Sequence, residues 1–322
     1  MLATLAFATI LGTTTIALPG GPPVGMDYLA VDAANRRVWV PAGNTGNVDV
    51  VDIATGKVIA IGGFPTAPSP RPGRPNMGPS SVTVGDGAVW VGNRADDRLC
   101  AFDPRTLERR ACIQLAAMPD GIAWVAPTHE LWATTPRDRT ITIVDPTAGK
   151  PSPAALKLDG DPEGYAVDAA RGVFYTNLED KDRTVAIDVR ARKVVATFAP
   201  GCGKEGPRGL ALDPARRLLF VACTDGAVAL DLAHQGRVTG RLKTAAGVDN
   251  IDYFAPRGLL YVAAGGDGTL TVAHAAKDGA LQAIATAPTA TRARNAVVDG
   301  SGTAYVADSI GGRLIVVKPP AP

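Results

Sequence analysis

The sequence predicts an all-β fold, a seven-bladed β-propeller with four antiparallel strands in each blade. Apolar and small residues alternate with a period of two between turns rich in Asp, Gly and Pro, and residues 209–231 show the pattern most clearly. An aromatic residue also recurs at a blade-sized spacing of roughly 41–51 residues. The aromatic positions are Trp39, Trp90, Trp132, Tyr175, Phe220, Tyr261 and Tyr305.

Each aromatic marks the second strand of a unit, and the other strands are placed relative to it. The expected first strands are 28–32, 81–84, 121–124, 164–168, 209–213, 250–253 and 295–299. In five units the third strand ends in an apolar residue and Asp, at Asp52, Asp103, Asp145, Asp188 and Asp231. Fourth strands are expected at 58–61, 111–115, 194–198 and 281–285. Four strands in each of seven units define the propeller.

The two ends of the chain complete one blade. The last unit stops after its third strand, Arg313–Val317, and the missing fourth strand is found at Thr14–Leu18. We therefore expect a single propeller domain over 13–318, with a tail at 319–322. The apolar segment 1–12 lacks a basic start, so we interpret it as a leader remnant or as an extension of the closing strand. It is too short to span a membrane as a helix.

Composition excludes some classes of partner. The 322 residues carry a formal net charge of +2, which provides no overall attraction to nucleic acid or to a membrane. Binding of single-stranded nucleic acid needs aromatic platforms beside basic grooves, and few aromatic residues are expected near the channel. These observations argue against a nucleic-acid partner, and no membrane span is expected.

The four cysteines form two feasible pairs. Cys100 and Cys112 flank a hairpin turn almost symmetrically, whereas Cys202 precedes a first strand and Cys223 ends the next one. We predict the disulfides Cys100–Cys112 and Cys202–Cys223, which favour a periplasmic or secreted protein. The alternative is four buried thiols in a cytosolic protein.

The blades resemble the YncE-like (YVTN) propellers over nearly the whole chain. The residues that carry the resemblance are Val173-Phe-Tyr-Thr-Asn177, Leu260-Tyr-Val-Ala-Ala264, Ala304-Tyr-Val-Ala-Asp308 and the turns at Asp52 and Asp145. The resemblance implies a secreted or periplasmic binding propeller.

Weaker similarities point to two enzyme families. Residues 79–90 are similar to blades of streptogramin-B lyases, but no histidine here matches their histidine-centred site. Residues 119–123 and 162–168 are similar to first strands of the SMP-30/gluconolactonase propellers. There, carboxylates and asparagines at such positions hold a divalent metal over the channel, so the resemblance implies the same type of position here.

Propeller geometry brings the loops before the first strands together at one mouth of the channel. The expected ligand-binding residues there are Asp27, Glu205, Arg208, Asp249, Arg292 and Arg294. Asp120 and Glu163 are candidate general acid and base residues, because one member of a carboxyl pair can keep its proton at neutral pH. With Asn250 and Asn295 they are also candidate oxygen ligands for Ca²⁺ or Mg²⁺.

Three hypotheses for function follow. The leading one is an envelope propeller, not an enzyme, that binds a small anionic ligand or a protein partner through the arginines of the mouth. The alternative is a divalent-metal-dependent hydrolase or lactonase at the same mouth. The third, ranked last, is sequence-independent binding of single-stranded DNA. The remaining alternative is that the charges of the mouth form a solvated rim, or pair with each other, and bind no ligand.

Two further features bear on the mouth. None of His129, His234 and His274 is expected to reach it, which argues against a histidine nucleophile or a zinc site. The proline-rich insertion 64–79 is expected to fold over the channel as a partial lid offering Arg71 and Arg74, or else to be a plain surface insertion.

Overall fold

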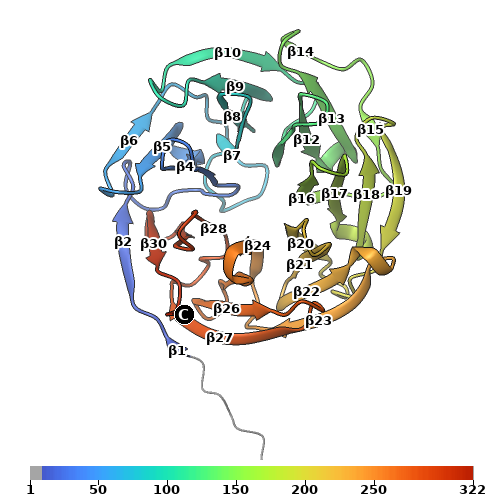
Figure 1. The fold of residues 1–322 in the computed structure, drawn as a ribbon. Coiled ribbons are helices and arrows are strands. Elements are labelled where there is room, and N and C mark those ends of the chain that lie inside the picture. Colours follow the sequence, from blue (N-terminus) through green and yellow to red (C-terminus); the bar gives the residue numbers. More distant parts are fainter. Residues whose placement is uncertain (1–8, 322) are drawn as a thin grey trace, which may run out of the picture.

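The computed structural model, which describes residues 9–321, is a ring of seven four-stranded antiparallel blades around a central opening (Figure 1). The inner strands surround the opening, and they are β3 (Ala30–Asp32), β7 (Pro79–Gly85), β11 (Ile122–Val125), β16 (Pro162–Asp168), β20 (Pro207–Asp213), β24 (Val248–Phe254) and β28 (Ala296–Val298). The seven-bladed, all-β fold predicted from the sequence is confirmed.

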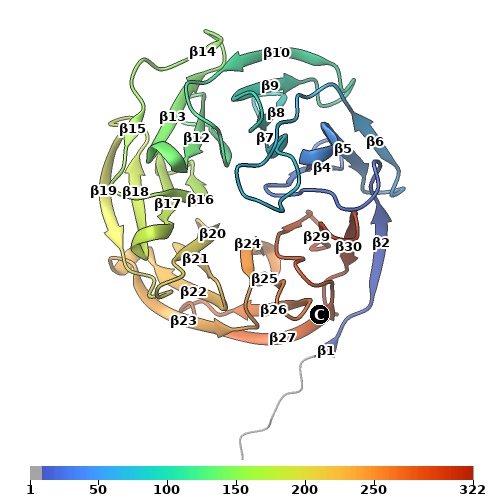
Figure 2. The same ribbon diagram turned by 180° about the vertical axis from the view of Figure 1, so that it is seen from behind.

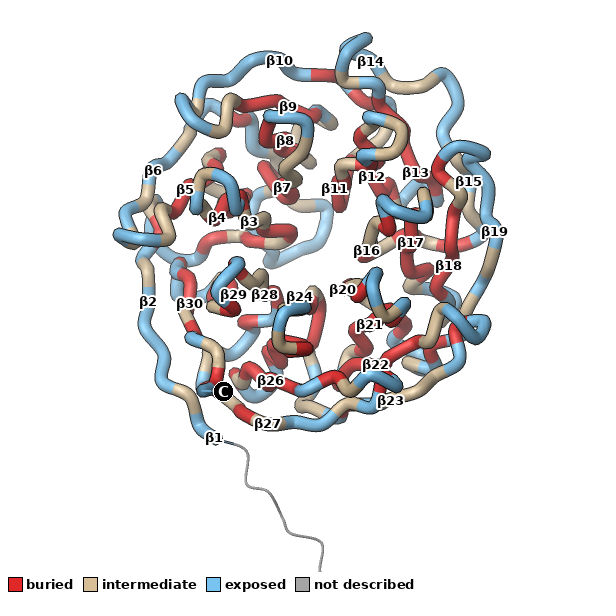
Figure 3. The backbone as a smooth tube through the Cα atoms, in the orientation of Figure 1, coloured by how far each residue is buried: buried red, intermediate tan, exposed pale blue. Residues whose placement is uncertain are grey.

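The second and third strands of each blade form the buried middle of the ring (Figure 3). The second strands are β4 (Arg37–Ala42), β8 (Ala88–Asn93), β12 (Glu130–Thr135), β17 (Val173–Leu178), β21 (Leu218–Cys223), β25 (Leu259–Ala264) and β29 (Ala304–Asp308). The third strands are β5 (Asn47–Asp52), β9 (Arg98–Phe102), β13 (Thr140–Asp145), β18 (Arg183–Asp188), β22 (Gly226–Asp231), β26 (Thr269–Ala275) and β30 (Arg313–Val317). All seven repeat aromatics are buried between neighbouring blades, where they replace exposed apolar area with packing contacts.

The outer strands are largely exposed. They are β6 (Val58–Ile61), β10 (Arg109–Gln114), β14 (Lys150–Pro151) with β15 (Leu156–Lys157), β19 (Lys193–Phe198), β23 (Arg237–Lys243), β27 (Leu281–Pro288) and β2 (Thr13–Ala17). In the third blade the outer strand is split into β14 and β15, both paired with β13. Pro151 and Pro153 interrupt the ladder there because proline has no backbone N–H to donate.

The ring closes as the sequence predicts. Strand β2 pairs antiparallel with β30, from Thr13 opposite Val317 to Ala17 opposite Arg313. The strand β1 (Thr9–Ile10) continues outward and pairs in parallel with Ala285 and Thr286 of β27. Of the segment 1–12, residues 1–8 lie outside the described residues.

Both expected disulfides are present. Cys100 and Cys112 stand directly opposite each other on β9 and β10, and Cys202 is bonded to Cys223 at the end of β21. Among the described residues, no helix is long and apolar enough to cross a membrane. The helical content is limited to 3₁₀ turns: η1 (Gly43–Thr45), η2 (Pro136–Asp138), η3 (Glu179–Lys181), η4 (Leu232–His234) and η5 (Ala255–Arg257).

One buried acid in β5, Asp49, lies in surroundings that do not satisfy its hydrogen-bonding groups. Asp49 is 0% exposed, and neither of its carboxyl oxygens has a hydrogen-bond partner. Burial raises the pKa of this carboxyl group to about 7. At the matching place in β18 and β22, three residues before the last Asp of the strand, the chain carries Val185 and Val228. An apolar side chain therefore suits this position better than an unpaired acid.

We expect Asp49→Val to stabilise the protein by about 1–3 kcal/mol at pH 8, the typical cost of a buried unsatisfied polar group. The folded state holds a proton up to about pH 7 that the unfolded state releases near its ordinary pKa. Wild-type stability should therefore fall as pH rises between about 4 and 7, and the valine variant should lack this loss. Urea denaturation at pH 5 and pH 8 measures both effects, with Asp159→Val at an exposed position as control. Equal stability of wild type and Asp49→Val at pH 8 would contradict this account.

Candidate functional site

The antiparallel order of each blade places the start of its inner strand and the end of its second strand on one face of the ring. Seven such sets of loops meet around the central opening, as the view along the channel shows (Figure 1). We call their charged and aromatic residues the channel mouth, which consists of Asp27, Tyr28, Arg94, Asp120, Glu163, Asp249 and Arg294.

Glycines let the inner strands approach each other closely at the mouth. A Cβ on Gly164 would lie 2.4 Å from Cα of Gly209, and a Cβ on Gly209 would lie 2.7 Å from Cα of Asn250. Real Cβ atoms do not tolerate such contacts, so only glycine fits between these strands. Glu163 and Arg208 stand immediately before these glycines, so the close packing of β16 and β20 brings the strand starts that carry them together.

Arg94, in the loop between β8 and β9, holds two carboxylates together. Its Nη2 atom lies 2.7 Å from Oδ2 of Asp27 and also donates to Oδ1 of Asp120. The three side chains come from different blades and are mostly buried, with exposed fractions of 22%, 21% and 11%. Charge-assisted hydrogen bonds of this kind are stronger than neutral ones, and their partial burial reduces screening by solvent.

Tyr28 connects Asp120 to Glu163. The Tyr28 hydroxyl lies 3.2 Å from Oδ2 of Asp120 and 3.5 Å from Oε1 of Glu163. A phenol has one proton and can donate to only one of these carboxyl groups at a time. Burial, reinforced by Asp120, Asp249 and Asp27, raises the pKa of Glu163 well above its ordinary value. Glu163 therefore keeps a proton at pH values where an ordinary glutamate is ionised.

Two of the three arginines expected to bind a ligand, Arg208 and Arg294, are already paired. Nε of Arg294 lies 3.1 Å from Oδ2 of Asp249, and Arg208 donates to Glu179 in the neighbouring loop. Burial still raises the pKa of Asp249 to about 6, although Arg294 opposes the shift. Arg208 and Glu179 neutralise each other and are left out of the count. The mouth then contains four carboxyl groups and two guanidinium groups.

Below the mouth, the channel contains a cavity of about 330 Å³. Its wall combines polar and apolar side chains from five inner strands or the residues that precede them, among them Asp27, Tyr28, Tyr165, Leu210, Asn250, Asp252, Asn295 and Val297. The Asn295 amide donates toward Asp27 at 3.5 Å, and its oxygen accepts from the Asn250 backbone at 3.2 Å. The mouth and the cavity are thus parts of one connected site.

The structure gathers some of the expected residues and separates others. Asp27, Asp120, Glu163 and Asp249 converge, as expected from the geometry of the ring. Glu205 and Arg292 are exposed, and neither takes part in an ion pair among residues 9–321. The roles assigned to these residues stay predictions.

Two of the expected metal ligands, Asp120 and Asn295, are engaged by other residues in this arrangement. Both oxygens of Asp120 accept hydrogen bonds, from Arg94 and Tyr28, and a guanidinium occupies the space beside them. Asn295 is committed to backbone and side-chain partners. The described part of the chain holds no group of three His, Cys, Asp or Glu residues placed to bind a metal.

Sequence reasoning missed Arg94 and Asp252. Arg94 directly follows Asn93, the last residue of the second strand β8, and the ends of the second strands lie on the mouth face, so this place in the sequence was the available signal. Asp252 stands in the inner strand β24, and an acid at a channel-lining position was the available signal. Burial raises the pKa of Asp252 to about 7.

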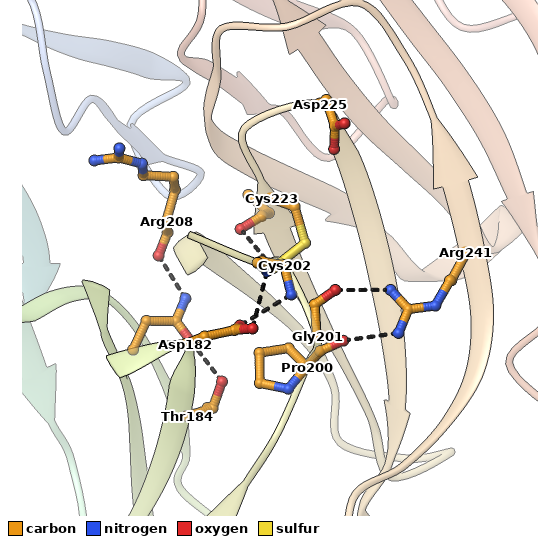
Figure 4. Close-up of a disulfide and its surroundings, with 12 residues drawn as sticks. Asp182, Thr184, Pro200, Gly201, Cys202, Arg208, Cys223, Asp225 and Arg241 are labelled. Atoms are coloured by element: carbon orange, nitrogen blue, oxygen red, sulfur yellow. Dashed lines mark hydrogen bonds between the residues drawn. A yellow bond between two sulfur atoms is a disulfide. The ribbon is translucent and has the colours of Figure 1, made fainter. Parts of the chain in front are cut away.

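The second disulfide fixes the loop that carries Arg208 (Figure 4). The Asp182 carboxylate accepts from the backbone amides of Cys202 and Gly203, both at 2.9 Å. Arg241 donates to the carbonyl groups of Pro200 and Gly201 on the other side of the same loop. The start of β20 is therefore held from several directions.

Two other expectations concern the surroundings of the mouth. His129, His234 and His274 belong to strand ends and turns on the opposite face of the ring. The loop between β6 and β7 reaches toward the central opening in Figure 2, and it is braced by the pairing of Ala67 with Met77. Its function as a lid stays a prediction.

Comparisons with known proteins support the fold. No family model matches the sequence, and neither does any curated protein. A chain of the mitotic checkpoint complex is 15% identical, with a TM-score of 0.78 over 100% of this chain and 95% of that one. Streptogramin B lyase is 10% identical, with a TM-score of 0.74 over 96% and 97%. An inactive histidine-to-alanine variant of virginiamycin B lyase from Staphylococcus aureus, solved with quinupristin, is 13% identical, with a TM-score of 0.75 over 96% and 100%. At these identities the likeness shows the propeller fold alone.

We expect Arg94→Met to destabilise the protein by about 3–5 kcal/mol at pH 8, because it leaves two mostly buried carboxylates without their cation. The loss should be smaller at pH 5, since the raised pKa of Asp120 allows a proton to relieve the repulsion. Thermal and urea unfolding measure both, and the exposed Arg98→Met serves as control. A loss below 1 kcal/mol at both pH values would show that Arg94 does not hold the mouth together.

Proposed function

We propose that the protein is a binding propeller that captures a cationic group of a small ligand at the channel mouth. The observation that carries the proposal is the excess of carboxyl groups left after Arg94, Arg208 and Arg294 are paired. Glu163 has only the long contact to Tyr28, and its raised pKa reports the crowding of negative charge around it. An incoming ammonium group relieves this crowding and replaces the retained proton.

We also propose that the protein works outside the cytoplasm, in the periplasm or as a secreted protein. The two disulfides, Cys100–Cys112 and Cys202–Cys223, support this location because such bonds persist in oxidising compartments. Membership of the YncE-like propellers is consistent with the blade motifs and belongs to the same proposal.

Capture of an anion, the leading hypothesis from the sequence, has less support in the geometry. An anionic ligand must compete with Asp249 for Arg294 and with Glu179 for Arg208. Of the three expected arginines, the exposed Arg292 alone has no ion-pair partner in residues 9–321, and it lies outside the buried part of the mouth. An anion also approaches four carboxyl groups, which raises the electrostatic cost of binding.

A metal-dependent hydrolase is also disfavoured. A divalent ion at Asp120 has to displace the Arg94 guanidinium from the carboxylate, a costly exchange for a partly buried pair. The similar lyase structures do not supply a mechanism either. One of them is an inactive histidine variant, and the histidines of this chain lie on the far face.

Isothermal titration calorimetry with 1-aminopentane tests the proposal. Glu163→Gln should weaken binding about tenfold, the effect of losing one charge-assisted hydrogen bond. The exposed Asp138→Asn, in the turn η2 on the same face, is the control and should bind as wild type does. Affinity should rise from pH 5 to pH 8, because ionisation of Glu163 favours the ammonium group, and protons should be released on binding.

The same titrations with phosphate and with Ca²⁺ separate the alternatives. Phosphate binding that is lost in Arg208→Gln, without amine binding, would establish the anion hypothesis. Ca²⁺ binding that is lost in Glu163→Gln would establish the metal hypothesis. If the amine binds wild type and Glu163→Gln equally, the proposed site is wrong.

A further inference from the structure

A second acid lies deeper in the same channel. Asp252 is the fifth residue of β24 and lines the cavity together with Asn250, while Asp249 stands near the start of this inner strand at the mouth. The Asp252 carboxylate accepts hydrogen bonds at 2.7 Å from the backbone amides of Tyr253 and Val298. These bonds fix the position of the carboxylate. No basic side chain of the described residues forms an ion pair with it.

The two acidic levels are separated along the channel axis. A regular strand rises about 3.3 Å per residue, and the bulge between Val248 and Ile251 shortens this path, so Asp252 lies at most about 10 Å beyond Asp249 along β24. Asp27 contacts Asn295, which pairs with Asn250, two residues before Asp252. The Asp27 level is therefore about 7 Å from the Asp252 level. A ligand that contacts both levels needs cationic groups about 7–10 Å apart.

The wall of the cavity that contains Asp27 and Asp252 also suits a hydrocarbon chain. Tyr28 and Tyr165 stack with ring centroids 5.8 Å apart and line the cavity together with Leu210 and Val297. Aromatic faces stabilise a passing cation, and the apolar side chains pack against methylene groups. The side-chain nitrogen of Asn250 is buried and has no hydrogen-bond partner in residues 9–321, so the wall also retains an unused polar group.

We infer that the ligand is an elongated dication, an α,ω-diamine whose one ammonium group binds the mouth carboxylates and whose other reaches Asp252. The inference rests on the proposed function, because it places the first ammonium group at Glu163 and its neighbours. An extended chain of roughly five or six carbons covers the gap, given carbon–carbon bonds of about 1.5 Å. The cavity of about 330 Å³ accommodates such a molecule.

The inner group also sets a pH dependence distinct from that of the mouth. The backbone amides of Val298 and Tyr253 favour the ionised form of Asp252, and burial opposes it. The titratable side chain beside it is Tyr261, which stands opposite on the paired strand β25. With a pKa of about 7, Asp252 is mostly ionised at pH 8 and mostly protonated at pH 6. The advantage of a diamine over a monoamine should therefore grow between these pH values.

Calorimetry with 1,5-diaminopentane and 1-aminopentane at pH 8 tests the inference. Wild type should bind the diamine at least tenfold more tightly, and Asp252→Asn should remove this advantage without changing monoamine affinity. Asp278→Asn, at an exposed acid, is the control. A length series on the wild type gives a readout that needs no variant, since affinity should peak at five or six carbons and fall for 1,3-diaminopropane.

The outcomes separate this inference from the proposed function. If the monoamine binds and depends on Glu163, but the diamine binds no more tightly, the inference is wrong and the proposed function stands. If neither amine binds, both are wrong. An unchanged diamine advantage in Asp252→Asn would also overturn the assignment of the inner contact.

Discussion

The closure of the ring by β2 on β30 is the constraint on which the site depends. This ladder, from Thr13 opposite Val317 to Ala17 opposite Arg313, joins the two ends of the chain into one blade. A closed ring of seven blades forces all inner strands to begin around the same opening. Whatever charge the residues before those strands carry is then concentrated in a small volume with little solvent, where like charges shift each other's pKa.

The arginines of the mouth neutralise this concentrated negative charge only in part. Arg94 balances one of the two carboxylates it contacts, and Arg294 balances Asp249. Glu163 is left with a long hydrogen bond from Tyr28 and a pKa raised by burial and by neighbouring acids. In the proposed function, such a group holds its proton until a cation arrives, which links ligand binding to proton release. Asp252 places a further buried carboxyl group deeper in the channel.

The sequence predicted the fold, the closing strand and both disulfides, because strand alternation and turn residues fix which segments pair and which cysteines meet. It also predicted that Asp120 and Glu163 meet. It did not predict the partners of the arginines, since side-chain directions in loops follow no simple period. Arg208 pairs with Glu179 and not with Glu205, which is exposed, and Arg94 was overlooked although it follows Asn93. The net charge of the mouth depends on these pairings. The arginines expected at the mouth from the sequence favoured an anionic ligand, whereas their pairing in the structure favours a cationic one.

Carbon-13 NMR titration of the glutamate carboxyl groups, with Glu163→Gln to assign the signal, tests the central claim most directly. The account predicts that the Glu163 carboxyl group titrates well above the ordinary glutamate value of about 4.3, and that saturating 1-aminopentane shifts it downward. A Glu163 carboxyl group that titrates near that ordinary value, unchanged by the amine, would contradict it. The mouth would then be a rim of solvated, mutually balanced charges.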